Sequence, residues 1–163
     1  MFVLGIDPGL SRCGYSILSG RGASTRAVAA GVITTEPHEP VPQRLVALQQ
    51  EIRRLLDEFA PSVLAIERVL FQINVRTAMG VGQAAGVVMA EAAATGCEVV
   101  EYSPNQVKQA VCGDGAATKQ QVGEMVRMLL GLSEQLRPAD VSDAAAVALC
   151  HMAQSPAPAV ARR

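Results

Sequence analysis

Three apolar runs open the chain, and short polar turns separate them. They cover residues 2–7, 14–19 and 27–35 and consist mostly of side chains that are common in β-strands. The turns between them leave no room for a crossover connection, so neighbouring runs have to be antiparallel. The pattern therefore predicts a three-stranded antiparallel meander.

The periodicity changes after a proline-bounded loop at residues 37–42. In QRLVALQQEIRRLLDEFA, residues 43–60, Leu and Ile recur every three or four positions, which is typical of an amphipathic helix. A fourth strand is expected at 63–67 and a fifth at 98–102. The Ala- and Gly-rich stretch 77–95 between them is expected to be helical, with Gly96 ending the helix.

Three further helices complete the predicted elements. Ser103 and Thr118 are favourable N-cap residues for SPNQVKQAV and TKQQVGEMVRMLLGL, and a last helix is expected over about 140–153. These elements predict one α/β domain at residues 1–153, with a mixed five-stranded sheet flanked by helices and a crossover between the fourth and fifth strands. Residues 154–163 are expected to be a disordered tail, because they offer too little apolar surface to fold.

Composition narrows the class of protein. The 163 residues suffice for one domain; half are hydrophobic but only 3% aromatic, so small and aliphatic side chains must build the core. A net charge of -1 gives no global sign of nucleic-acid binding. The chain shows no signal-peptide pattern, no membrane span and no zinc-ligand spacing among its four cysteines. We therefore expect a cytoplasmic protein with reduced thiols and no membrane partner.

Carboxylates stand beside apolar segments in three places. Asp7 ends FVLGID, Glu67 ends VLAIE, and Asp140 and Asp143 lie one turn apart at the start of DVSDAAAVALC. An acid beside a core is unfavourable unless a cation meets it. Oxygen ligands suit Mg²⁺ or Mn²⁺, and two such ions roughly 3.5 to 4 Å apart support phosphodiester hydrolysis. The four acids together therefore predict a metal-dependent nuclease.

Each acid has a simpler explanation when it is taken alone. Asp7 precedes Pro8 and could start a turn by accepting a hydrogen bond from its own backbone. Glu67 could pair with Arg68 or another cation at the end of a strand. Asp140 could be the N-cap of the last helix. The metal site is favoured because all four acids recur beside the core, where mutual repulsion requires a cation or a proton.

A series of motifs along the chain resembles the RuvC family. In order they are GIDPG with GYSI, AIER, NVRTAMGVGQAAG, SPNQVKQAV with GDGAATKQQV, and DVSDAAAVALCH. RuvC proteins are bacterial endonucleases with a ribonuclease H-like fold that resolve Holliday junctions, the four-way DNA junctions of recombination and repair. The resemblance covers Phe2 to Ala153. It implies a homodimer that nicks two like strands symmetrically, with RuvA and RuvB as partners.

The resemblance also implies roles for particular residues. It assigns the metal-binding and catalytic acids to Asp7, Glu67, Asp140 and Asp143, and it places Lys108 and Lys119 near the scissile phosphate. Without the resemblance, both lysines would be read as solvated surface residues. Some family members have His where this chain has Asp140, which makes Asp143 the safer assignment.

One part of the family pattern is altered. The family commonly has an aromatic residue three positions after the second acid, where it probes bases at the crossover, whereas this chain has Leu70 there and Phe71 next. Either Phe71 takes the role or Leu70 does so without stacking; Phe71 could also be a core residue. Arg68 and Arg76 are further candidates for phosphate contact. The glycines at 80, 82 and 86 fit either a dimer interface or core packing.

Three other functions are compatible with part of the pattern. A ribonuclease H-like processing factor for structured RNA would share the strand-one Asp. A non-catalytic junction-binding scaffold would share the acidic cluster. Sugar-kinase and actin-like ATPases also begin with a GIDPG-like turn, but they need two such domains and a second phosphate loop, for which 163 residues leave no room.

Overall fold

The structure is a computed structural model that describes residues 2–69 and 75–154. For residues 75–77 it describes the backbone but not the side chains. Within these residues one sheet forms in the order β3-β2-β1-β4-β5. Its strands are β1 (Phe2–Asp7), β2 (Arg12–Ser19), β3 (Arg26–Thr34), β4 (Val63–Glu67) and β5 (Glu98–Tyr102). The helices are η1 (Gly22–Ser24), a 3₁₀ turn, and α1 (Val41–Phe59), α2 (Val75–Ala94), α3 (Pro104–Cys112), α4 (Lys119–Leu129) and α5 (Ala139–Gln154).

The strand directions confirm the predicted mixed sheet. β1, β2 and β3 pair antiparallel as a meander, whereas β4 lies parallel to β1 and β5 lies parallel to β4. The helix α2 supplies the predicted crossover between β4 and β5. The parallel pairing of β1 with β4 places the carboxyl ends of these two strands side by side.

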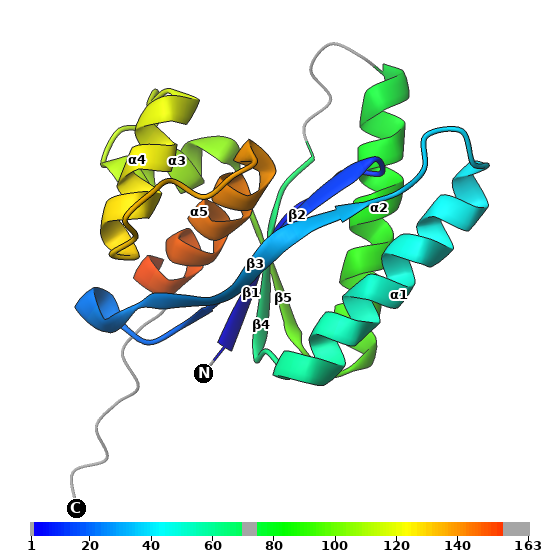
Figure 1. The fold of residues 1–163 in the computed structure, drawn as a ribbon, viewed down its shortest axis with the longest axis horizontal. Helices are drawn as coiled ribbons and strands as arrows, with labels where there is room; N and C mark the ends of the chain where they lie inside the picture. Colours follow the sequence, from blue (N-terminus) through cyan, green and yellow to red (C-terminus); the bar gives the residue numbers. More distant parts are fainter. Residues whose placement is uncertain (1, 70–74, 155–163) are drawn as a thin grey trace, which may run out of the picture.

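Helices cover both faces of the sheet (Figure 1). α1 and α2 lie on one face, and α3, α4 and α5 lie on the other. The alternation along β1 separates two cores: Leu4 and Ile6 pack toward α1 and α2, whereas Val3 packs toward α5. α5 lies so close to β1 that a Cβ on Gly5 would meet the Ala144 carbonyl oxygen. This position of β1 accepts only a glycine without rearrangement.

The ends of several elements differ from the sequence prediction. α1 begins two residues earlier, at Val41, because Pro42 fits the first turn of a helix. α4 ends at Leu129 rather than near residue 132, and Gly131 follows in the left-handed region, with φ of 64°. α5 extends through Gln154, one residue into the predicted tail. The rest of that tail, residues 155–163, lies outside the described residues.

The predicted caps and thiols are present as expected. The hydroxyls of Ser103 and Thr118 accept hydrogen bonds from the backbone N–H groups of Gln106 and Gln121, so both helices begin where the sequence predicts. All four cysteines are free. Among the described residues, no helix combines the length and the apolar character that a membrane crossing requires.

Candidate active site

Two of the predicted acids stand at the carboxyl ends of neighbouring strands. β1 and β4 pair in register, with Ile6 opposite Ile66, so Asp7 and Glu67 are the next residues of the two strands. Because side chains alternate along a strand, Asp7 shares the face of Val3 and Gly5, and Glu67 shares that of Ala65. This is the face that α5 covers. Both carboxylates therefore lie on the α5 side of the sheet.

The first turns of α5 bring in the other two acids. α5 contacts β1 and β2, and a Cβ on Gly14 of β2 would lie 3.0 Å from the Cβ of Asp140. Asp143, three residues later on the same helical face, is among the charges that raise the pKa of Asp7 and Glu67. α5 begins at Ala139, so the alternative of Asp140 as the N-cap is wrong: Asp140 lies inside the first turn.

The turn suggested for Asp7 and the pairing of Glu67 with Arg68 are not found in the part of the chain that the structure describes. Among the described residues, the carboxylates of Asp7 and Glu67 accept no hydrogen bond and form no ion pair, so neither the turn nor a salt bridge with Arg68 is present. Burial, then Asp143 and Glu67, raise the pKa of Asp7 to about 7. Burial, then Asp143, also raise the pKa of Glu67. Both acids are held where a negative charge is unfavourable, which is the environment that a bound cation would relieve.

Three cationic side chains surround the acids. Lys119 Nζ donates to Asp143 Oδ2 at 2.9 Å, and this hydrogen bond raises the lysine pKa. Lys108 lies close enough to lower the pKa of Glu67. The structure thus brings both predicted lysines beside the acids. Lys119 reaches this position as the first residue of α4, directly after the Thr118 cap.

The third cation, Arg12, was not among the residues predicted from the sequence. Its Nε and Nη2 donate to Asp140 Oδ2 at 3.1 and 2.7 Å. Its place in the PGLSRCG turn, directly after the strand that carries Asp7, is the signal that could have indicated it. Arg12 and Lys119 thus pair the two α5 acids, while the two strand acids stay unpaired among the described residues.

The four acids lie near one another, but their side chains are not arranged as a set of metal ligands. Over the described ranges 2–69 and 75–154, no three Asp, Glu, His or Cys side chains are grouped so that they could hold a metal ion. Carboxylates without a bound cation repel one another. Here Asp140 and Asp143 form ion pairs with Arg12 and Lys119. Metal binding by Asp7, Glu67, Asp140 and Asp143 stays a prediction.

A buried arginine fixes the loop that follows Asp7. Arg44 of α1 is 8% exposed; its Nε donates to Thr35 Oγ1 at 2.9 Å and its Nη2 to Ser11 Oγ at 2.6 Å. Thr35 Oγ1 in turn donates to the Leu10 carbonyl oxygen. The loop between β1 and β2 is therefore tied to the end of β3 and to α1. No sequence pattern indicated this role, because Arg44 lies next to the apolar stripe of an ordinary amphipathic helix.

The predicted base-probing residues lie outside the described part of the chain. Leu70 and Phe71 fall in the undescribed segment 70–74, so the choice between them stays open. Arg76 belongs to the first turn of α2, but its side chain is outside the description. The roles of these three residues stay predictions.

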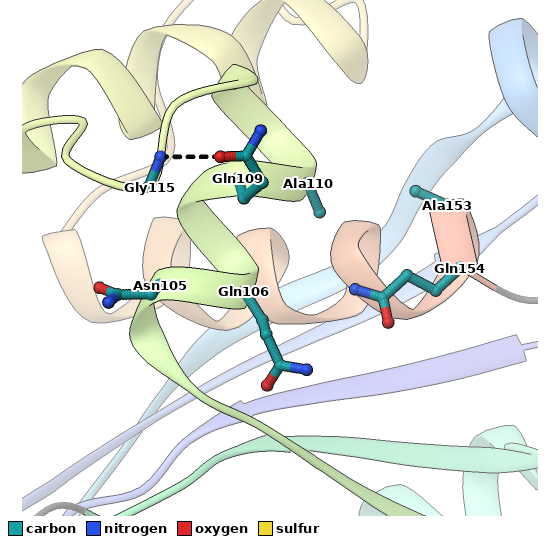
Figure 2. Close-up of a pocket in the computed structure, with 7 residues that line it drawn as sticks. All are labelled: Asn105, Gln106, Gln109, Ala110, Gly115, Ala153 and Gln154. Carbon is teal, nitrogen blue, oxygen red and sulfur yellow. Dashed lines mark hydrogen bonds between the residues drawn. The ribbon is translucent and has the colours of Figure 1, made fainter.

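A separate cleft of about 530 Å³ lies where α3 meets the end of α5 (Figure 2). Its lining is rich in amides and contains no ionisable side chain: Asn105, Gln106, Gln109, Ala110, Gly115, Ala153 and Gln154. Among these residues, the Gly115 N–H donates a hydrogen bond to Gln109 Oε1 at 3.1 Å. None of the four acids lines this cleft, so it is not part of the acidic site.

Comparisons with known proteins identify the family. Residues 3–151 match the family model described as crossover junction endodeoxyribonuclease RuvC. The RuvC of Natranaerobius thermophilus is 44% identical over 151 residues, which are 93% of this chain and 94% of that protein. A solved structure of Thermus thermophilus RuvC is 38% identical with a TM-score of 0.87, covering 94% of both chains. A second, of that RuvC in complex with a Holliday junction substrate, has a TM-score of 0.88 at 38% identity and covers 93% of this chain and 92% of the other. The chain belongs to the RuvC family of crossover junction endodeoxyribonucleases, as its motifs predicted.

Proposed function

We propose that this protein resolves four-way DNA junctions by nicking two like strands symmetrically, with the carboxylates at the ends of β1, β4 and α5 as its catalytic site. Membership of the RuvC family supports the substrate and the reaction class. One observation carries the assignment of the site: acids from three separate elements share one electrostatic environment, in which Asp143, Glu67 and Asp140 all raise the pKa of Asp7. Each nick would leave a 5′-phosphate and a 3′-hydroxyl, which a ligase can join.

The donor set fits hard divalent cations. Asp7, Glu67, Asp140 and Asp143 offer only carboxylate oxygens, the ligands that Mg²⁺ and Mn²⁺ prefer. The burial of Asp7 and Glu67 without a cation partner among the described residues is the structural feature that a metal would satisfy. When bound, two such ions supply the activation of the attacking water and the stabilisation of the leaving oxygen.

The chain's own cations have complementary roles. Lys119 and Lys108 flank the acids and would hold the negatively charged phosphate of the substrate beside them. Because Lys119 pairs with Asp143, the lysine is oriented toward the site before DNA arrives. Arg12 holds Asp140 in the same way. Arg44 keeps the loop after Asp7 in place and so acts as a positioning residue.

A homodimer suits a substrate with near two-fold symmetry, because a closed C₂ assembly presents two identical sites. α2 is our candidate interface. Apart from the adjoining residues and backbone of α2 itself, no described atom lies within 4 Å of the point where a Cβ of Gly82 or Gly86 would stand, and Met79 on the same helix is 59% exposed. This weakens core packing as the reason for these two glycines. RuvA and RuvB as partners are inferred from the family resemblance, and a cytoplasmic location is inferred from the reduced thiols that the sequence predicts.

The test is cleavage of a mobile synthetic four-way junction with each strand end-labelled in turn, in Mg²⁺ or Mn²⁺, with linear duplex as a control. We expect paired nicks in opposite strands. Asp7→Asn should slow cleavage by roughly three orders of magnitude or more while junction binding persists, because several kcal/mol of transition-state stabilisation would be lost. The matched control is Asp57→Asn, an exposed acid on α1, which should cleave as the wild type does.

Two results would replace the proposal. Junction binding without cleavage under any divalent ion would indicate a scaffold, and preferential cleavage of structured RNA would indicate a processing factor. If Asp7→Asn cleaves normally, the acid cluster is not the catalytic site. Circular dichroism of each variant shows whether a loss of cleavage reflects a loss of folding.

A further inference from the structure

A second cleft adjoins the acids on the α4 side. Its volume is about 770 Å³, and it is bounded by the start of α4, the segment 135–139 and the first turns of α5. The polar residues of its lining are Lys119, Gln120, Gln135, Arg137, Ser142 and Asp143. Because Lys119 and Asp143 belong to both the cleft and the candidate active site, the cleft is a continuation of that site.

The charges of this cleft favour an anion. Its lining holds two cations, Lys119 and Arg137, and a single carboxylate, Asp143, which Lys119 already binds. Arg137 is exposed, and its guanidinium has no hydrogen bond or ion pair to any described residue. Two other arginines are already in ion pairs: Arg12 with Asp140, and Arg127 with Glu124. Arg137 is thus a guanidinium left available beside the acids.

The wall of the cleft also contains a buried hydroxyl without a partner. Ser142 is 6% exposed, and its Oγ makes no hydrogen bond within the described part of the chain. The neighbouring residue on α4 is Gly123, where a Cβ would stand 3.6 Å from that Oγ. Buried hydroxyls usually have a partner. A cleft whose lining holds an unused guanidinium and a neutral amide, next to a buried hydroxyl without a partner among the described residues, is equipped to bind an oxyanion.

We propose that this cleft binds a backbone phosphodiester of the junction strand that is cut, next to the scissile phosphate, and that Arg137 is its main contact. The inference rests on the proposed function and extends it by one subsite. A guanidinium matches two phosphate oxygens at once, which a lysine ammonium cannot do. Gln120 at the rim can donate through its amide. The cleft would thereby set which phosphodiester of the strand lies over the acids.

The first experiment measures junction binding in EDTA, where no cutting occurs, for Arg137→Gln, Arg137→Lys and a matched control, Arg26→Gln. Arg26 is also exposed, but it begins β3 and pairs with Ser19, at the end of the sheet away from Asp7. We expect Arg137→Gln to weaken binding about tenfold and to lower the slope of log K against log salt by roughly one, the signature of one lost phosphate contact. Arg137→Lys should recover part of the affinity, and Arg26→Gln should match the wild type.

The second experiment modifies the DNA and compares the wild type with Arg137→Gln. Single methylphosphonates, which remove one phosphate charge, are placed in turn at each position flanking the cut. One position in the cut strand should weaken wild-type binding about tenfold and should not weaken Arg137→Gln further. A strongest effect in an uncut strand, or additive effects of the variant and the modification, would overturn the proposal, as would equal behaviour of Arg137→Gln and Arg26→Gln. If the wild type does not cut junctions at all, the proposed function fails instead.

Discussion

The two faces of the sheet are packed with side chains of different size. Toward α1 and α2, strands β1 and β4 present Leu4, Ile6, Leu64 and Ile66, all at most 1% exposed. Toward α5, the alternate positions include Gly5 and Ala65, and the helix itself contributes a run of alanines. Large aliphatic side chains fill volume, whereas small ones let two backbones approach. One face is therefore built for burial, and the other is built to fix a helix at short distance.

The difference has a functional consequence. The small residues of this face let the α5 backbone come close to the sheet, at Gly5 with Ala144 and at Gly14 with Asp140, and these close approaches help to place the acids on α5. A helix that sat farther from the sheet would carry Asp140 and Asp143 away from Asp7. The α5 face thus positions the chemistry, and the α1/α2 face supplies much of the buried aliphatic volume.

The strongest way to break this arrangement is Gly5→Ala. The new methyl group would overlap the Ala144 carbonyl oxygen and lie 2.8 Å from the Ala148 Cβ, so α5 would have to move. We expect a loss of about 4 kcal/mol or more in the free energy of unfolding, because backbone atoms cannot yield as a side chain can. Urea denaturation checks this value, and junction cleavage should fall even at temperatures where the variant is folded. Unchanged stability would show that α5 is not tightly seated.

On the opposite face, Leu48→Ala should cost about 3 kcal/mol. Leu48 of α1 is fully buried, and its truncation leaves a cavity without moving any acid. If the two faces differ as described, the folded fraction of this variant should cleave junctions at the wild-type rate, in contrast to Gly5→Ala. The measurement is single-turnover cleavage at a temperature where circular dichroism shows full folding. A reduced rate there would mean that the α1/α2 face also positions the site.

The α5 face should also make stability depend on pH. Burial, Asp143 and Glu67 raise the pKa of Asp7 from 3.8 to about 7, so the folded protein binds this proton more tightly than the unfolded chain does. The resulting stabilisation is complete below about pH 4 and is lost as pH rises toward 7. In EDTA we expect Asp7 to account for a loss on the order of 3 kcal/mol across this range.

Asp7→Asn is the matched variant for this pH dependence. Urea denaturation of the wild type and of Asp7→Asn at pH 5 and pH 8 isolates the contribution of Asp7, because other groups titrate in both proteins. The wild type should lose more stability between the two pH values. Parallel losses in both proteins would contradict the raised pKa. Mg²⁺ should restore the wild type more at pH 8 than at pH 5, if it binds the ionised carboxylate.

The sequence predicts the strands and helices better than the contacts between them. Alternation, helical periodicity and caps such as Ser103 are local signals, and they located every strand and every α-helix of the described residues within a few residues, although not the short 3₁₀ turn η1. The acids were recognisable because a carboxylate after an apolar strand is unusual. The family resemblance pointed to Lys119, the partner of Asp143, but two other features were not recognisable: Arg12 meets Asp140 across 128 positions of the chain, and the cleft beside Arg137 exists only once α4 and α5 are packed. Such contacts depend on tertiary distance, which no local pattern encodes.

The smallest predicted effect uses the same substitution as the largest. Gly86 lies on the exposed side of α2, where, apart from the adjoining residues and backbone of α2 itself, no described atom is within 4 Å of the point that the new methyl group would occupy. Gly86→Ala should therefore raise the free energy of unfolding of the monomer by roughly 0.5 to 1 kcal/mol, because alanine favours the helix. Urea denaturation at concentrations low enough to keep the protein monomeric checks this value. If α2 is the dimer interface, the same methyl group should also weaken self-association in sedimentation equilibrium. A destabilised monomer would mean that packing requires a glycine at position 86, as it does at position 5. Close backbone packing would then not be confined to the α5 face of the sheet.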